Sequence, residues 1–197
     1  MLTQPIPSLS HIAELKTARL HLRPWQASDH APFAALNADP EVMRYFPATL
    51  DSAASAAFIH NTHQHFARYG WGLWAVEILH GPDAGDFIGF VGLSVPKRQF
   101  AFSPCVEIGW RLAQRYWRRG YASEAARTVL EFGFKELDLA EIVSFTSVLN
   151  VPSRAVMEKI GLHNQQQDFD HPALPDGHAL QRHCLYALQK SAWLTLA

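Results

Sequence analysis

The sequence has few cysteines, no long apolar run and no excess of charge. Its 197 residues include only two cysteines, Cys105 and Cys184, which excludes a disulfide framework and a four-thiolate zinc site. No segment approaches the roughly 18 uninterrupted apolar residues of a membrane-spanning helix, and the N-terminus lacks the basic start of a signal peptide. We therefore expect a cytoplasmic protein that binds no membrane, with both cysteines buried as small apolar residues.

The charges nearly balance, with 17 lysines and arginines against 18 acidic residues and a net charge of −1. This balance argues against a nucleic-acid partner, because such proteins carry a basic surface. The chain holds 11 histidines, but His60, His63 and His65 have no acidic or thiol neighbour, so we expect no metal site. A hydrophobic content of 48% excludes a disordered chain, and the length suits one domain.

The apolar pattern predicts a fold of the α+β class. We expect residues 1–14 to form a flexible arm and residues 15–190 to form one domain. Strands are predicted at residues 15–24, 71–79, 86–95, 105–112, 141–148, 162–169 and 180–188. Helices are predicted near residues 28–37, 52–69, 122–137 and 151–160.

The connections between these elements predict how the strands pair. Short turns favour antiparallel pairing of the first strands, whereas the helix at 122–137 makes the strands on either side of it parallel. The expected architecture is a twisted, mixed and mostly antiparallel sheet of six to seven strands, flanked by about four helices. An exposed last strand would be able to pair with a second copy of the chain, so a homodimer is one expected assembly.

Residues 105–137 carry the strongest functional signal, because they predict a strand, a turn containing Gly120 and then a helix. In such a turn, backbone N–H groups from about Arg118 to Ala122 point ahead of the helix, where the helix dipole adds positive charge. Gly120 permits a positive φ, and the small Ala122 leaves the helix start uncrowded. No acidic residue lies between positions 108 and 123, which hold the arginines 111, 115, 118 and 119. The segment predicts a phosphate or diphosphate site that is neither a P-loop nor a Rossmann fingerprint.

Five runs of sequence, in this order, resemble the motifs of the GNAT N-acetyltransferase superfamily and of its RimJ/RimL-like branch, the ribosomal-protein N-terminal acetyltransferases. They are TARLHLRP (17–24), VEIGW (106–110), WRRGYASEAA (117–126), NVPS (150–153) and MEKIGL (157–162). The chain departs from the general pattern of the turn, Q/R-x-x-G-x-G/A, because Trp117 occupies its first position. The backbone cradle remains available, since it uses N–H groups and not that side chain.

The resemblance implies a GNAT fold and acetyl-CoA as cosubstrate, without a metal. The pantetheine arm would run between two splayed parallel strands that end near Leu112 and Val148. The residues implied to bind the cosubstrate are Leu112, Arg118, Arg119, Gly120, Tyr121, Ala122, Ser123 and Asn150. For Asn150 a structural alternative stays open, because asparagine at this position also suits the N-cap of the helix that follows.

The resemblance also implies direct attack of an amine on the thioester in a ternary complex. Glu107 is the leading candidate for the base, acting directly or through water, although a strand glutamate facing solvent is an equal alternative. Ser153 is the candidate donor to the departing thiolate. Many relatives use a tyrosine as the acid where this chain has Met157, which cannot donate a proton.

The identity of the acceptor stays open between a protein N-terminal α-amine and a small-molecule amine. The segments expected to select it are residues 24–52 and 95–104, with Trp25 and Tyr45 as candidates to line its pocket. A second hypothesis is a non-catalytic module that binds or senses acyl-CoA, suggested by Met157. A third, an RNA-binding domain that uses the arginines at 111–119, is disfavoured because no aromatic stacking motif accompanies them.

Overall fold

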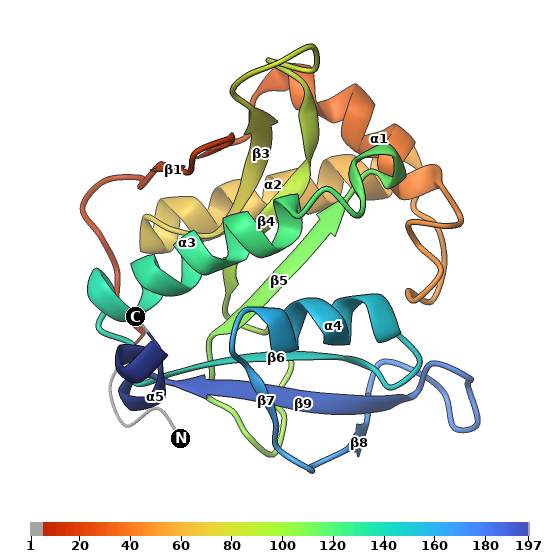
Figure 1. Cartoon of the computed structure of the whole chain (residues 1–197). Coiled ribbons are helices and arrows are strands. Elements are labelled where there is room, and N and C mark those ends of the chain that lie inside the picture. Colours follow the sequence, from red (N-terminus) through yellow and green to blue (C-terminus); the bar gives the residue numbers. More distant parts are fainter. Residues whose placement is uncertain (1–5, 197) are drawn as a thin grey trace.

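The computed structural model describes residues 6–196, which form one mixed sheet with helices on its faces (Figure 1). The strands are β1 (Leu15–Lys16), β2 (Leu20–Arg23), β3 (Leu73–Ile78), β4 (Phe87–Ser94), β5 (Glu107–Leu112), β6 (Glu141–Ser147), β7 (His163–Asn164), β8 (Phe169–Asp170) and β9 (Arg182–Gln189). The helices are α1 (His30–Ala38), α2 (Ser52–Tyr69), α3 (Tyr121–Lys135), α4 (Val151–Lys159) and α5 (Lys190–Leu196).

The sheet order is β1-β2-β3-β4-β5-β6-β9-β7, and β8 also pairs with β9. Among the strands of residues 6–196, only the β5–β6 pair is parallel, and the other pairs are antiparallel. The α+β class and the mixed, mostly antiparallel sheet are therefore confirmed. The nine strands of the described chain exceed the expected six to seven because β1, β7 and β8 have two residues each, too few for an alternating pattern to stand out.

Two predicted strands are interrupted, and one helix was not predicted. The strand expected at 15–24 folds into the β1–β2 hairpin, since Thr17 Oγ1 accepts the backbone N–H of Arg19 (3.2 Å) and of Leu20 (2.9 Å) and so turns the chain. The strand expected at 162–169 is divided into β7 and β8, and Gln166 between them has a positive φ of 57°. Helix α5, which packs Trp193 against Phe134, begins directly where β9 ends.

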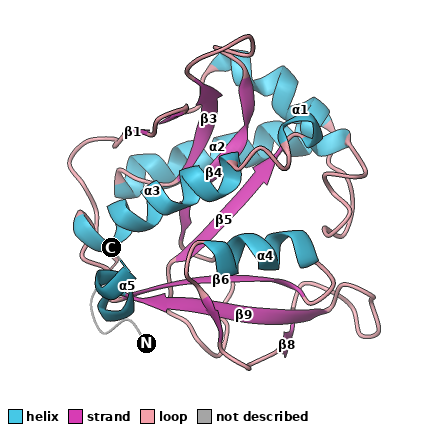
Figure 2. Cartoon of the chain, viewed as in Figure 1, coloured by secondary structure: helices cyan, strands magenta, loops and turns pink. Residues whose placement is uncertain are grey.

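The helices cover the sheet in layers, as Figure 2 shows, with α3 in front of the central strands and α2 behind them. Helix α3 packs on β4 and β5, and α1 packs on α2 and β4. The core includes the fully buried Trp71 and Trp74. Strand β4 runs so close to its neighbours that a Cβ on Gly89 would lie 2.1 Å from the carbonyl oxygen of Arg111, so only glycine fits there.

The parallel strands β5 and β6 are joined only at their beginnings. Their one paired position is Glu107 with Val143, and Ser144 Oγ adds a hydrogen bond of 2.9 Å to the carbonyl oxygen of Ile108. Beyond this point the two strands diverge like the arms of a V (Figure 1). The splayed parallel strands expected near Leu112 and Val148 are therefore present.

The first described residues pack against the domain. Leu9 and Ala13 donate backbone hydrogen bonds to the carbonyl oxygens of Tyr69 (2.8 Å) and Gly70 (2.9 Å), and Trp74 Nε1 donates to the Ala13 carbonyl oxygen at 2.7 Å. Residues 6–14 of the expected flexible arm are thus held in place, whereas its residues 1–5 lie outside the described chain.

The last strand is not an exposed edge. Strand β9 pairs with β6 on one side and with β7 and β8 on the other. The expectation that it offers a free edge to a second copy is therefore wrong. The sequence signal failed because two-residue strands are enough to cover such an edge.

Candidate active site

A cavity of about 1250 Å³ opens where β5 and β6 diverge. Strand β5 contributes all its residues to the wall, and residues 144–146 of β6 contribute the opposite side. The turn before α3, the beginning of α4 and most of residues 41–47 complete it. The cavity therefore collects segments from both halves of the sheet and from the α1–α2 connection.

The turn before α3 leaves a row of backbone N–H groups without partners. Arg118 (φ 61°) and Gly120 (φ 82°) both have left-handed backbone conformations, which turn neighbouring N–H groups toward a common concavity. Within residues 6–196, none of the N–H groups from Arg118 to Ser123 donates a hydrogen bond, and the first helical bond runs from Glu124 N to Gly120 O at 3.0 Å. The donors and the α3 dipole together make a site for an anion.

The start of α3 is fastened to the β1–β2 turn through Glu124. Its carboxylate accepts hydrogen bonds from Thr17 Oγ1 (2.5 Å), from the Arg19 backbone N–H (3.0 Å) and from Arg19 Nε (2.7 Å). Burial raises the pKa of Glu124, but these hydrogen bonds outweigh it and the net pKa is lowered. Arg19 also donates to the Arg119 carbonyl oxygen at 3.1 Å, so the β1–β2 turn holds the turn before α3 in shape.

Two of the four arginines at positions 111–119 are paired with carboxylates and are not free to bind an anion. Arg115 pairs with Asp86 (3.1 Å) and Arg119 pairs with Asp83 (3.0 Å), both from the β3–β4 connection. The Arg119 side chain therefore does not line the cavity, although its backbone belongs to the turn, whereas Arg118 does line it. The absence of acidic residues nearby in the sequence concealed these partners, because the hairpin supplies them in space.

Trp117, which replaces the expected glutamine or arginine, has a structural contact of its own. Its indole Nε1 donates a hydrogen bond of 2.7 Å to the carbonyl oxygen of Leu112. This bond ties the turn to the end of β5, while the ring stays 41% exposed and lines the cavity. The departure at this position thus leaves the backbone donors of the turn intact.

Two predicted residues meet at the beginning of α4. Asn150 Oδ1 accepts the backbone N–H of Ser153 at 3.2 Å, and Asn150 Nδ2 donates to Thr146 Oγ1 at 2.9 Å. The N-cap alternative for Asn150 is therefore confirmed, and the residue also lines the cavity. The Ser153 side chain lines the cavity too, and its hydroxyl has no hydrogen-bond partner among the described residues. Met157, only 2% exposed, closes the wall behind it.

Glu107 stands at the point where β5 and β6 part, and it lines the cavity. Burial raises the pKa of its carboxyl to about 8. Within the described chain its side chain has no ion pair or hydrogen bond that would favour the charged form. A carboxyl in this condition exchanges a proton near neutral pH, as a general base must.

Arg111 lies two positions beyond Gly109 on the face of β5 that also carries Glu107, and it is 9% exposed. Its Nη1 donates to Asn37 Oδ1 at 2.6 Å, whereas its buried Nε has no partner in residues 6–196. Burial lowers the pKa of Arg111 to about 10, so the guanidinium stays charged at neutral pH. The alternation of residues along the strand could have predicted this placement, because it puts Arg111 on the same face of β5 as Glu107, whereas the other arginines follow the strand.

The two segments expected to select the acceptor, residues 24–52 and 95–104, differ in whether they line the cavity. In residues 24–52, positions 41, 42 and 44–47 line the cavity, and Tyr45 is among them as predicted. Trp25 is not: it is 4% exposed, lies 4.7 Å from the Phe33 ring centre, and donates from Nε1 to the Leu73 carbonyl oxygen at 2.7 Å. The prediction for Trp25 is wrong because its position near a helix break gave no information about which face it covers.

Residues 95–104, the second such segment, do not line the cavity. Phe100 and Phe102 stack with ring centres 5.1 Å apart, and Phe100 lies 4.9 Å from Phe145. The connection therefore builds an aromatic cluster behind the cavity, on the outer side of Phe145. His171 and His183, which do line the cavity, join this cluster with ring centres 4.8 Å apart, and sequence reasoning did not single them out.

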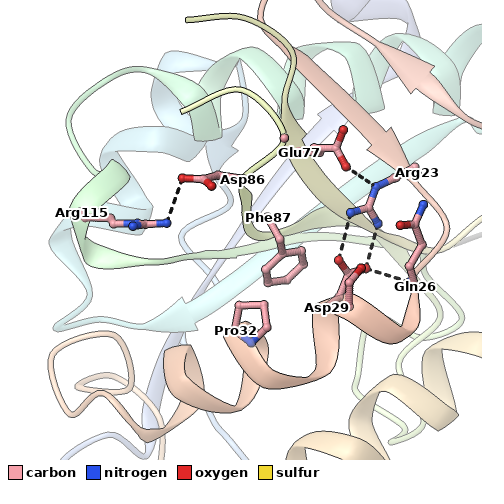
Figure 3. Close-up of a pocket in the computed structure, with 10 residues that line it drawn as sticks. Arg23, Gln26, Asp29, Pro32, Glu77, Asp86, Phe87 and Arg115 are labelled. Atoms are coloured by element: carbon pink, nitrogen blue, oxygen red, sulfur yellow. Dashed lines mark hydrogen bonds and ion pairs between the residues drawn. The ribbon is translucent and has the colours of Figure 1, made fainter. Parts of the chain in front are cut away.

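A second cavity, of about 350 Å³, lies between α1 and the β3–β4 hairpin (Figure 3). Arg23 occupies its floor and donates to Asp29 Oδ2 and Oδ1 at 2.8 and 2.9 Å, and to Glu77 Oε2 at 2.8 Å. The hydrogen bond to Asp29 contributes most to raising the pKa of Arg23. Each charged side chain that lines this pocket is already paired, Arg23 with Asp29 and Glu77 and Arg115 with Asp86, so these contacts serve to hold α1 to the sheet.

Nine of the ten predicted site residues line the large cavity, and the exception is the side chain of Arg119. Within residues 6–196, no group of three or more His, Cys, Asp or Glu side chains is placed to hold a metal ion. In the same part of the chain, every helix is too short or too polar to span a bilayer. Both cysteines are free and buried, as predicted.

Known proteins resemble this chain in sequence and in fold. Residues 19–163 match the family model described as Acetyltransferase (GNAT) domain. The chain is 32% identical over 193 residues to the FsC-acetyl coenzyme A-N(2)-transacetylase of Aspergillus fumigatus, an alignment that covers 92% of this chain and 78% of the relative.

Two solved structures extend the likeness. The acetyltransferase (GNAT family) from Bacillus anthracis superposes with a TM-score of 0.73 at 26% identity, covering 91% of this chain and 99% of that one. RimL, a ribosomal L7/L12 alpha-N-protein acetyltransferase solved with coenzyme A, superposes with a TM-score of 0.71 at 13% identity, covering 91% and 99%. The second likeness, at this low identity, is one of fold alone. The chain therefore belongs to the GNAT acetyltransferase family and is an acetyl-CoA-dependent N-acetyltransferase.

Proposed function

We propose that the protein transfers the acetyl group directly from acetyl-CoA to a primary amine, with both substrates bound at once and no acyl-enzyme. One observation carries this proposal: a row of unpartnered N–H groups and a carboxyl with a raised pKa face the same cavity between diverging strands. Holding the amine against the thioester supplies much of the acceleration, so few catalytic side chains are needed.

The proposed position of the cosubstrate follows from charge. The diphosphate of acetyl-CoA would accept hydrogen bonds from the N–H groups of Arg118–Ser123, where the helix dipole favours an anion. The pantetheine arm would then follow the gap between β5 and β6, past Leu112 and Asn150, toward Glu107. Leu112 and Asn150 both line the cavity, which supports this route for the pantetheine arm.

Glu107 is proposed to accept the proton of the amine, directly or through a water molecule. A base works best when its pKa is close to the working pH, and burial brings the pKa of Glu107 to about 8. Its position where the two strands part places it beside the proposed path of the thioester. The nearby Cys105 is not a competing nucleophile, because burial raises the pKa of its thiol to about 11.

Ser153 is proposed to donate a hydrogen bond to the departing thiolate, the role that Met157 cannot take. Replacing Ser153 by alanine is expected to lower kcat by about 10-fold, the size of one weak transition-state hydrogen bond, and to leave the KM for acetyl-CoA within about twofold. Steady-state kinetics would measure both. Ser153→Thr is the matched control, because it keeps the hydroxyl and should keep most of the activity. Equal kcat values for Ser153→Ala and the unaltered protein would remove this role.

The test of the proposed function is an acceptor screen at fixed acetyl-CoA, with release of free thiol as the measurement. The panel should hold amino acids, polyamines and short peptides with free N-termini, so that small amines and protein N-termini are both represented. Acetyl transfer to at least one amine, without a burst that would indicate an acyl-enzyme, is the expected result. Tight binding of acetyl-CoA without turnover on any amine would instead indicate a module that only binds acyl-CoA.

A further inference from the structure

We infer that the acceptor amine also carries a carboxylate, and that Arg111 binds this carboxylate. The inference rests on the proposed function and names the class of acceptor that its site would take. A free amino acid and a peptide with an acidic residue near its N-terminus share the required chemistry.

The first support is the charge balance around Arg111. The residue is nine-tenths buried and remains protonated at neutral pH, yet no carboxylate of residues 6–196 lies within ion-pair distance of it. Its one hydrogen bond is to the neutral amide of Asn37, and its Nε is buried without a partner. A buried cation normally has a counter-charge, because taking an unpaired charge out of water is costly.

The second support is the position of Arg111 in the cavity. It belongs to the wall formed by β5, opposite residues 41–47 of the α1–α2 connection. Its Cζ lies 4.1 Å from the centre of the Phe46 ring, 5.5 Å from that of Phe90 and 5.8 Å from that of Phe58. The aromatic rings hold the guanidinium plane but do not neutralise its charge, so an anion is still required.

The third support is the separation of the charges along β5. Glu107 and Arg111 share one strand face but are four residues apart, which places their Cα atoms roughly 13 Å from each other. They therefore do not neutralise one another, and each remains available to a different end of one ligand. An acceptor whose amine lies near Glu107 and whose carboxylate reaches Arg111 would satisfy both groups.

Glu41 also lines this end of the cavity, but it does not act as the missing counter-charge of Arg111. Glu41 is exposed and lies 3.8 Å from Arg44, three positions further along the chain. Arg44 stacks over Tyr45 at 5.8 Å, so it too is engaged at the rim. Arg111 is thus a buried cation at the end of the cavity near residues 41–47. Glu41 and Arg44, at the rim of that end, supply no counter-charge for it.

The experiment compares each acceptor with its carboxamide, at fixed acetyl-CoA. One arm pairs free L-amino acids with their amides; a second pairs amidated tripeptides that have Asp or Asn as the second residue. In the arm that resembles the natural acceptor, we expect kcat/KM to be about 10-fold or more higher for the acceptor with the carboxylate than for its carboxamide. Because amidation also lowers the pKa of the amine, kcat/KM is expressed per unprotonated amine, so that the preference can be read from the unaltered protein and also compared between variants.

Arg111→Met is the informative variant, since methionine fills the space between the aromatic rings without a charge. We expect its carboxylate preference to fall to about one, while calorimetry finds acetyl-CoA affinity within about twofold of the unaltered protein. Arg111→Lys should keep part of the preference. Arg115→Met is the matched control, because it removes a 66% exposed arginine outside the cavity and should keep the full preference.

Three results would overturn the inference. They are equal turnover of acids and amides by the unaltered protein in both arms, an unchanged preference in Arg111→Met, or loss of acetyl-CoA binding in that variant. The first needs no variant, so it decides the matter even if Arg111→Met does not fold. Acetyl transfer with equal turnover leaves the proposed function standing, whereas no turnover on any amine rejects that function and the inference with it.

Discussion

Replacing Glu107 by glutamine is expected to lower kcat for acetyl transfer by about 100-fold or more at pH 8. Glutamine keeps the size and hydrogen-bonding capacity of the side chain but cannot accept the proton of the amine. The KM for acetyl-CoA should change little, because Glu107 is remote from the N–H groups proposed to hold the diphosphate. Steady-state kinetics with the best amine of the acceptor screen would measure both constants.

The pH profile separates a base from a residue that only supports the structure. Because burial raises the pKa of Glu107 to about 8, its carboxyl is protonated below that pH and active as a base above it. In the unaltered protein kcat should therefore rise about 10-fold per pH unit below pH 8 and level off above it. Glu107→Gln should lose this limb and keep only the pH dependence of the amine. An unchanged kcat with an unchanged profile would remove Glu107 from the mechanism.

The raised pKa of Glu107 also affects the stability of the fold. Raising the pH is expected to increase activity but to decrease stability. A carboxyl with a folded-state pKa above its unfolded value stabilises the fold most below the unfolded value, about 4.5, and this contribution is lost as the pH rises through about 8. Glu107→Gln carries no charge to bury, so its melting temperature at pH 9 should equal or exceed that of the unaltered protein. A catalytic loss with no loss of stability would place the effect in the chemistry.

Replacing Ala122 by aspartate is expected to weaken acetyl-CoA binding by about 100-fold or more, as measured by calorimetry. Ala122 is half-buried in the first turn of α3 and lines the cavity. A carboxylate here would lie beside the proposed diphosphate, and two unit charges about 4 Å apart repel by roughly 4 kcal/mol at an effective dielectric constant of 20. The substitution should not harm folding, because an acidic residue in the first turn favours the helix dipole by about 0.3–1 kcal/mol.

Ala122→Asn is the matched control for this experiment. Asparagine has nearly the same shape as aspartate but no charge, so the difference between the two variants reports electrostatic repulsion and not crowding. We expect the difference to shrink in high salt, since the repulsion at a solvent-accessible site is screened. Equal affinities for the two variants would place the diphosphate away from the turn.

The sequence was most informative where local chemistry decides the structure. Helix α2, predicted at residues 52–69, is an example: Asp51 accepts the N–H of Ala54 at 2.7 Å where the helix begins, and Gly70 ends it with a φ of 76°. The strand–turn–helix around Gly120 was equally predictable, because its glycine, small residues and helix start all favour one conformation. The cavity residues in this segment were found for the same reason.

What could not be predicted depends on contacts between distant parts of the chain. The pairing of Arg119 with Asp83 is made across a hairpin, so a list of neighbours in the sequence gave the wrong charge environment. The two-residue strand β7, which covers one edge of β9, has no period that a pattern could reveal. The isolation of Arg111 becomes visible only in the folded chain, where no carboxylate of residues 6–196 lies within ion-pair distance of it.

The V between β5 and β6 has a consequence for protein engineering. Two central strands that pair at one position leave hydrogen-bonding capacity and packing unused in the middle of the domain. Substitutions that extend the pairing of these strands would raise the melting temperature, and they would also fill the space in which the reaction is proposed to take place. A library selected for heat resistance alone should therefore accumulate inactive variants with substitutions in β5 and β6. The residues of these two strands that face the gap should be kept unchanged in such a selection.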